Sequence, residues 1–308
     1  MRRTKSVVPR CRHRRIELGS TYLVTQKCRE HRCLITPSVI TNQVLLYLLA
    51  LKAARYGIWV HGFCFMSNHF HLVVTDPHGQ LPVFMGTFLS ESSKALQVAL
   101  RISGPIWNRR RYSATQLLDL DAAERELAYT ITNPTNAELT TPNDWPGLSS
   151  VHYEVSDTIT AKRPPMYFSK RYRPDEVSID LVPLGQAYVL GDDTASARAV
   201  ERLVSDRCEL ISDKLKREGK ALAGAEKVLR TSRQSKGNHP LGGLNPRFAS
   251  RNKQLLAAAI AESYEFELLF AKARDRYISG QTRVVFPPGT YGYRQQLGVR
   301  VLRRAPAA

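Results

Sequence analysis

The chain has 308 residues, enough for two domains or for one domain with a long extension. Its hydrophobic content of 43% is ordinary for a globular protein and excludes wholesale disorder. Charge is the outlying property, because 45 Lys and Arg against 27 Asp and Glu give a formal net charge of +18. Such an excess calls for an anionic partner, usually nucleic acid, with a basic membrane-surface protein as the main competitor.

The sequence gives little evidence for a membrane-spanning protein or a disulfide-rich protein. No stretch reaches the ~20 consecutive apolar residues of a membrane span, and the basic start is not followed by the apolar core of a signal peptide. We therefore expect a cytoplasmic protein without a membrane partner. The five cysteines are odd in number and form no C-x-x-C pair, so neither a disulfide framework nor a zinc knuckle is expected.

The chain begins with a basic arm. Residues 1–15 contain no acid and seven basic side chains: Arg2, Arg3, Lys5, Arg10, Arg12, Arg14 and Arg15. A solvated tail and a flexible arm that neutralises phosphates are equally good interpretations of this run.

The first elements are a strand and a helix. Residues 22–25 predict a strand after a Gly-Ser turn. Apolar residues spaced three and four apart predict a helix that opens at Pro37 and ends at Gly57. Residues 58–60 then lead into the apolar stretch 61–76, with which they can form a hairpin of two central strands.

Within that stretch, His69 and His71 stand two residues apart. Side chains alternate along a strand, so both imidazoles point one way while Phe70 points into the core. Two imidazoles from one buried strand can hold a divalent metal. Two satisfied structural histidines are nevertheless the commoner outcome of this spacing, so the motif alone does not decide.

A second helix and an arginine cluster follow. The apolar pattern predicts a helix over residues 81–100. Next comes Trp107-Asn108-Arg109-Arg110-Arg111-Tyr112, in which basic side chains stand between aromatic rings. This arrangement suits single-stranded nucleic acid, since phosphates and splayed bases are both engaged. A solvated arginine run is the alternative.

A third helix carries a tyrosine and an asparagine on one face. Asp121 is a good N-cap for a helix over residues 122–133, which a proline then ends. Tyr129 and Asn133 are four residues apart, so both can address the same point. A buried core tyrosine is the alternative for Tyr129.

The composition shifts near residue 155. Residues 162–174 are rich in Lys, Arg and Pro and predict a basic linker. Helical patterns return over roughly 194–217 and 251–273, with a loop at 232–243 between them.

Two blocks in this order resemble a known family. They are Met66-Ser67-Asn68-His69-Phe70-His71-Leu72 and Tyr129-Thr130-Ile131-Thr132-Asn133-Pro134. Together they resemble the single-tyrosine HUH transposases, above all the transposase-like proteins associated with repetitive extragenic palindromes. The resemblance covers about residues 16–153. Ser67 departs from it, because the family usually has proline there.

The resemblance implies an α+β fold for residues 16–154, a ferredoxin-like antiparallel sheet with helices on one face. Residues 155–308 would be a basic, mainly helical C-terminal extension. The resemblance also implies a metal-dependent nickase and strand transferase that acts on single-stranded, hairpin-forming DNA through a 5′-phosphotyrosine intermediate. Tyr129 would be the nucleophile. His69, His71 and Asn133 would bind Mg²⁺ or Mn²⁺.

We expect DNA contacts from the basic arm and the arginine cluster. The residues concerned are Arg2, Arg3, Arg12, Arg14, Arg15, Arg109, Arg110 and Arg111. A non-catalytic, structure-specific DNA or RNA binder on the same fold is the rival hypothesis, and an unrelated basic α/β protein with an incidental His-x-His is a third. Tyr112 and Tyr153 are alternative nucleophiles, whereas His61 and His78 are not expected to be primary ligands. A homodimer is left open.

Overall fold

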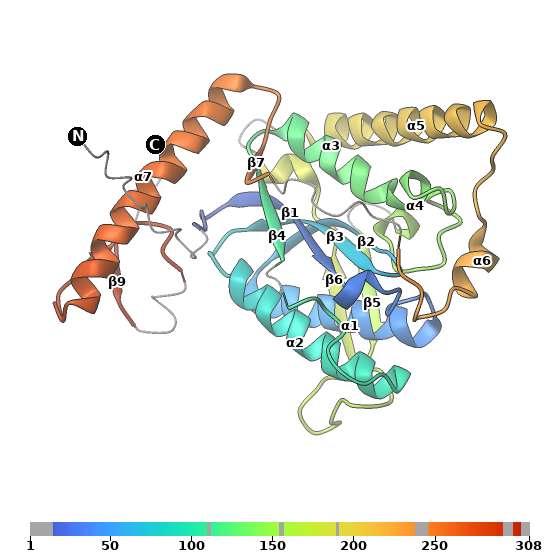
Figure 1. Cartoon of the computed structure of the whole chain (residues 1–308), viewed down its shortest axis with the longest axis horizontal. Coiled ribbons are helices and arrows are strands. Elements are labelled where there is room, and N and C mark those ends of the chain that lie inside the picture. The colour runs from blue at the N-terminus through green and yellow to red at the C-terminus, as the bar shows by residue number, and fades with distance from the viewer. Residues whose placement is uncertain are drawn as a thin grey trace, which may run out of the picture. The chain divides into compact units, whose positions relative to one another are not determined.

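The computed structural model describes residues 15–109, 112–153, 157–188, 191–237, 246–291 and 298–302. The contacts between residues divide the chain into two units (Figure 1). One unit is Gly19–Arg251, and the other combines the residues before Gly19 with those after Arg251.

The unit Gly19–Arg251 is built around a five-stranded sheet in the order β2-β3-β1-β4-β7. The strands are β1 (Ser20–Lys27), β2 (Trp59–Phe65), β3 (His69–Asp76), β4 (Ser113–Leu117) and β7 (Phe248–Ala249). The first four pair antiparallel, and β7 joins β4 in parallel. With helix α1 (Val39–Tyr56) after β1 and α2 (Leu81–Leu100) after β3, this is the β-α-β-β-α-β arrangement of ferredoxin-like folds. The expected α+β class with an antiparallel sheet is confirmed.

Helices α1 and α2 lie where the sequence predicts them. The hydroxyl of Ser38 caps α1, accepting a hydrogen bond of 3.2 Å from the backbone N–H of Thr41. Gly57 ends α1 with a left-handed φ of 63°, a conformation that glycine adopts at little cost. Helix α2 covers residues 81–100, as its apolar pattern predicts.

Alternation along β3 divides the sheet into two packed faces. Phe70, Leu72 and Val74 lie in a core shared with α1 and α2, whereas Val73 lies in a second core with helix α3 (Leu120–Ile131). Figure 1 shows α1 and α2 on one side of the sheet, and α3 with α5 (Asp193–Arg217) on the other. Helices therefore cover both faces of the sheet, whereas the resemblance implies helices on one.

The edge strand β2 is covered by residues 145–150. The backbone N–H of Phe65 donates to the carbonyl of Leu148 (2.8 Å), and the indole N–H of Trp145 donates to the carbonyl of Phe65 (3.1 Å). The hydroxyl of Ser150 bonds to the backbone of Phe63. These contacts satisfy an edge that would otherwise expose free backbone groups.

The prediction of a basic linker over residues 162–174 is wrong. Strands β5 (Thr158–Lys162) and β6 (Glu176–Asp180) form an antiparallel hairpin that flanks this segment. Ile159 and Ile179 pair across the hairpin and lie in the core that includes α1. The alternation of apolar and polar residues is strand-like, but it is short and embedded in basic residues.

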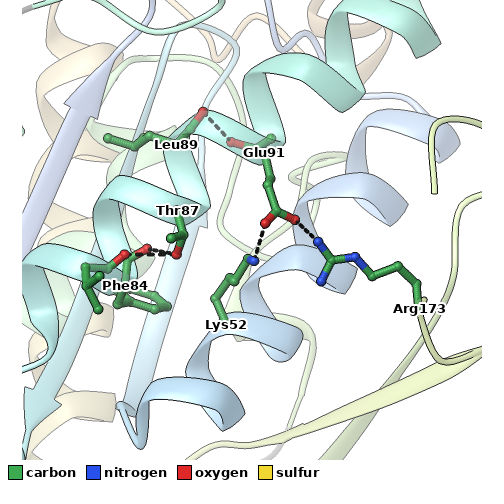
Figure 2. A network of polar contacts seen from close by, with 8 residues as sticks. Lys52, Phe84, Thr87, Leu89, Glu91 and Arg173 are labelled. Atoms are coloured by element: carbon green, nitrogen blue, oxygen red, sulfur yellow. Dashed lines mark hydrogen bonds and ion pairs between the residues drawn. The ribbon is translucent and has the colours of Figure 1, made fainter. Parts of the chain in front are cut away.

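A buried ion-pair network fixes the hairpin segment to α1 and α2 (Figure 2). The ammonium of Lys52, only 1% exposed, lies 2.5 Å from one carboxylate oxygen of Glu91. The guanidinium of Arg173 lies 2.8 Å from the other oxygen. Tyr47 adds a hydrogen bond of 2.8 Å to the carbonyl of Pro174. Because Glu91 serves two cations, the segment near Arg173 is held by the same carboxylate that satisfies the buried lysine.

The remaining helices of this unit are short. They are α4 (Asn133–Asn136), α6 (Ala225–Leu229) and the 3-10 turns Arg29–His31, Ser150–His152 and Leu184–Ala187. The second unit contains α7 (Lys253–Ile278) with β8 (Val285–Phe286) and β9 (Arg300–Val301), and Phe266, Phe270 and Phe286 form its core. Across the described residues, every helix is too short or too polar to cross a bilayer.

Candidate active site

Helix α3 is positioned by its cap and by a glycine in the sheet. The carboxylate of Asp119 accepts from the backbone N–H of Ala122 (2.7 Å), so Asp119 and not the predicted Asp121 is the N-cap. Asp121 instead pairs with Arg125 one turn later, at 3.0 Å. A Cβ at Gly62 of β2 would lie 2.4 Å from the side chain of Leu127, so glycine there lets α3 pack directly on the sheet.

The face of the sheet below α3 is apolar at one end and polar at the other. Val73 and Leu117 pack under α3. Towards the other end of the strands this face presents polar side chains instead. Together with Glu126 and Tyr129 of α3 they line a cavity of about 300 Å³, whose walls are Leu23, Thr25, Lys27, His69, His71, Ser113, Thr115, Glu126, Tyr129 and Pro246. The cavity is therefore the part of the sheet face where polar residues replace the apolar contacts to α3.

The two histidines share this face, as predicted. Their ring centroids are 5.0 Å apart, and His71 also meets the ring of Tyr129 edge-on at 5.4 Å. Both imidazoles are largely buried, at 5% and 6% exposed. The Nδ1 of His71 lies 3.0 Å from the hydroxyl of Thr25 on β1, which fixes the orientation of the ring.

The two ring nitrogens of His69 have different partners. Its Nδ1 lies 2.7 Å from Oδ1 of Asn68, and its Nε2 lies 3.2 Å from Oδ1 of Asn133. The amide nitrogen of Asn68 points to the carbonyl of His31 (3.4 Å), which fixes the Asn68 oxygen toward the histidine. Both partners are amide oxygens, which only accept, and a neutral imidazole carries one proton. One of the two ring nitrogens of His69 therefore faces an oxygen with its lone pair.

The Nε2 of His69 and the amide oxygen of Asn133 lie 3.2 Å apart, and both are ligand types for a divalent cation. His69, His71 and Asn133 together offer two imidazoles and one oxygen, which suits Mn²⁺ better than Mg²⁺. Among the described residues, no group of three or more His, Cys, Asp and Glu side chains could hold a metal ion. A three-ligand set at this site therefore depends on the amide oxygen of Asn133.

Tyr129 and Asn133 are linked as the four-residue spacing predicts. Burial raises the pKa of Tyr129, and hydrogen bonding with Asn133 opposes this rise. The side chain of Asn133 thus lies between Tyr129 and His69, since its oxygen also lies 3.2 Å from Nε2 of the imidazole.

Two charged residues of the site were missed by sequence reasoning. Glu126 lines the cavity one turn before Tyr129, and burial raises its pKa while Arg125 and Arg207 oppose the rise. Arg207 of α5 places its guanidinium 5.8 Å from the centroid of the Tyr129 ring. Val200 and Val204 of the same helix pack in the core beneath α3, so Arg207 occupies a position of the buried stripe. In the sequence, the signal for Arg207 is that a basic residue stands where the apolar stripe with Val200 and Val204 continues.

The arginines expected to bind DNA are only partly within the described residues. Arg2, Arg3, Arg12, Arg14, Arg110 and Arg111 lie outside them. Arg15 forms ion pairs with Glu17 and Glu262 in the second unit and is not a free cation. Arg109 is exposed and follows Asn108, whose backbone N–H donates to the carbonyl of Lys27 (2.9 Å) opposite His69. Arg109 therefore lies at the strand ends that carry the site.

The other residues considered are placed away from the cavity. Tyr112 and Tyr153 pack against the core on the α1 and α2 side of the sheet. His61 is buried between the carbonyl of Val182 and the hydroxyl of Thr75, at 2.7 Å from each. His78 is exposed in the loop after β3.

The cysteines within the described residues are free thiols. They are Cys28, Cys33, Cys64 and Cys208. Cys28 and Cys64 are fully buried, which raises the pKa of both thiols, that of Cys64 to about 12.

Comparison with known proteins gives little. No family model and no curated protein matches the chain. Among solved structures, a REP-associated tyrosine transposase bound to a REP hairpin is similar at a TM-score of 0.39 and 17% identity. The match covers 58% of this chain and 94% of that one. At these values nothing about the activity of the present chain follows from it.

Proposed function

We propose that this protein is a metal-dependent single-stranded DNA nickase and strand transferase that uses Tyr129 as its nucleophile. The observation that carries the proposal is the contact chain from Tyr129 through Asn133 to His69, with His71 against the tyrosine ring. A core tyrosine would need none of these partners. The hairpin-forming nature of the DNA rests on the sequence resemblance to single-tyrosine HUH transposases.

In this reaction the phenolic oxygen of Tyr129 attacks the scissile phosphorus. The O–P bond to tyrosine forms, the bond to the 3′ oxygen breaks, and the products are a 5′-phosphotyrosine and a free 3′-hydroxyl. The carboxylate of Glu126, whose pKa is raised by burial, can take the phenol proton and then give it to the departing 3′ oxygen, so that no proton is gained or lost overall. The covalent link conserves the phosphodiester bond energy, so the strand can be rejoined without ATP.

His69, His71 and Asn133 would hold Mn²⁺ or Mg²⁺. When bound, the ion would polarise the scissile phosphate and offset the charge that builds on its oxygens. The protein contributes the orientation of this site, because Asn68 and Thr25 fix the two imidazoles from their Nδ1 sides.

The second candidate is a DNA or RNA binder of the same fold without cleavage. The basic composition favours it as much as it favours the enzyme. It gives no reason for the placement of Tyr129 within the histidine cavity.

A cleavage assay separates the two. We would incubate the protein and Mn²⁺ with a pool of single-stranded DNA that contains hairpins, and look for a covalent adduct on denaturing gels. The nickase forms an adduct that needs Mn²⁺ and is lost in Tyr129→Phe. Tyr153→Phe is the matched control, because that tyrosine packs on the other face and its loss should leave the adduct intact. DNA binding without an adduct in any pool favours the binder.

A further inference from the structure

Two segments far apart in the sequence lie side by side near the start of β3. One is residues 29–33, between β1 and α1, and the other is residues 231–237, after α6. The N–H of Cys33 donates to the carbonyl of Ser235 (2.9 Å), and the N–H of Gly237 donates to the carbonyl of His31 (3.0 Å). Arg32 and Lys236 form a β-bridge between them. We call these segments the basic loop pair.

The loop pair concentrates positive charge. Its basic residues are Arg29, His31, Arg32, Arg233 and Lys236. Its one acid, Glu30, lies 2.7 Å from Arg32. Within the described ranges, neither Arg233 nor Lys236 has an ion-pair partner. Among the residues that the structure describes, no acid neutralises the charges of Arg233 and Lys236.

Several nitrogens here are buried without a hydrogen-bond partner in the described structure. They are Nε of Arg29, Nδ1 of His31, Nε of Arg32 and Nε of Arg233. Because these atoms are buried, an incoming phosphodiester does not reach them. They show that the basic groups of the loop pair are packed closely together.

The backbone here is strained. Glu30 and His31 are consecutive non-glycine residues in the left-handed region, with φ of 53° and 57°. Such residues are uncommon and gather where the chain serves a ligand or a catalytic group. The two residues lie where the first segment meets the second, because the carbonyl of His31 accepts from the N–H of Gly237.

The loop pair adjoins the candidate active site. The amide nitrogen of Asn68 donates to the carbonyl of His31 at 3.4 Å, while its oxygen lies 2.7 Å from Nδ1 of His69. The backbone N–H of Cys28 donates to the carbonyl of Asn68 (2.7 Å). One residue, Asn68, thus separates the basic loop pair from the first histidine.

We propose that the basic loop pair binds the phosphodiester backbone of the DNA strand that leads to the Tyr129 cavity. Arg233 and Lys236 make the phosphate contacts, while Arg29 is anchored by its bond to the carbonyl of Ser103 (2.7 Å). This inference rests on the proposed function for the identity of the strand. It adds a binding site that is outside the cavity, and its two phosphate contacts come from residues beyond the expected catalytic domain.

The salt dependence of DNA binding tests the site. Arg233→Gln/Lys236→Gln would be compared with Lys227→Gln/Arg230→Gln, which removes the same charge from exposed positions on and just after α6. Both variants carry Tyr129→Phe, so cleavage plays no part. The probe is a mixed-sequence single-stranded DNA, and its dissociation constant is measured over a range of salt concentrations.

The log–log slope of affinity against salt should fall by about 1.4 in the loop-pair variant, since each lost phosphate contact accounts for about 0.7. It should stay unchanged in the α6 variant. Equal slopes for the two variants, at unchanged melting temperature, would overturn the proposal. A slope change with RNA of the same sequence but not with DNA would overturn it in favour of RNA. If the slope falls as expected but no adduct forms in the cleavage assay, the loop-pair site stands and the nickase does not.

Discussion

The imidazole of His69 faces the amide oxygen of Asn133 across 3.2 Å, with its Nδ1 already directed to the oxygen of Asn68. An amide oxygen and an imidazole lone pair that face each other do not attract. A divalent cation between the two atoms, or a proton on Nε2, would make the contact favourable. This relationship connects the β3 histidine to α4, the short helix that follows the one carrying Tyr129.

Replacing Asn133 should therefore weaken metal binding. We expect Asn133→Leu to lower the affinity for Mn²⁺ at least tenfold, since it removes a ligand oxygen, whereas Asn133→Asp retains one. The thermal midpoint, followed as Mn²⁺ is added, reports the affinity because binding to the native state stabilises it. Asn136→Leu, on the same short helix but exposed, is the control. A wild-type response in Asn133→Leu would remove Asn133 from the metal site.

Arg207 should act through the charge of Glu126. Its guanidinium lies against the Tyr129 ring and counters the carboxylate nearby. We expect Arg207→Met to slow adduct formation about tenfold, equivalent to about 1.4 kcal/mol, with DNA affinity little changed. Glu126→Gln combined with Arg207→Met should be no slower than Glu126→Gln alone, because the charge that Arg207 counters is then absent.

Arg202→Met gives the matched control for that experiment, since Arg202 is exposed on the same helix. Additive losses in the double variant would show that Arg207 and Glu126 act independently, contrary to this expectation.

His61 should make the protein less stable in acid. Burial lowers its pKa to about 4, below its usual value near 6.5. The folded state therefore keeps His61 neutral while the unfolded chain binds a proton. Its contribution is fully present above about pH 6.5 and is lost as the pH falls toward 4, a change of roughly 3 kcal/mol. Urea unfolding of wild type and His61→Gln across this range should show a shallower pH dependence in the variant. Parallel curves would contradict this.

In the network of Figure 2, the free energy of unfolding should fall more when Glu91 alone is replaced than when Glu91 and Lys52 are replaced together. Glu91→Leu leaves the buried ammonium of Lys52 without a carboxylate, and we expect a loss of about 3 kcal/mol in the free energy of unfolding. Lys52→Met together with Glu91→Leu should cost less, because no buried charge remains. A double variant less stable than the single would show that the ion pair itself stabilises the fold.

The sequence predicts the elements that have strong local signals. The apolar periods of α1 and α2, and the alternation that places His69 and His71 on one face, need no tertiary information. The predicted helix over residues 122–133 is confirmed only in part, because α3 ends at Ile131 and Asn133 and Pro134 begin α4.

What the sequence does not predict depends on contacts between distant segments. Strand β7 adds only Phe248 and Ala249 to the sheet, too few residues to show a period. The approach of Arg207 to Tyr129 requires α5 to pack on α3. The proposed metal set is equally non-local, since His69 lies on β3 and Asn133 on α4.

The most direct measurement is to locate the covalent bond. The adduct formed with Mn²⁺ and hairpin DNA would be digested with nuclease and trypsin and examined by mass spectrometry. Cleavage after Arg125 and Lys162 yields a peptide that contains both Tyr129 and Tyr153, and fragmentation separates them. We expect the residual nucleotide to be attached through a 5′-phosphate to Tyr129. Attachment to Tyr153, to Tyr112 or to any other residue would contradict the central claim.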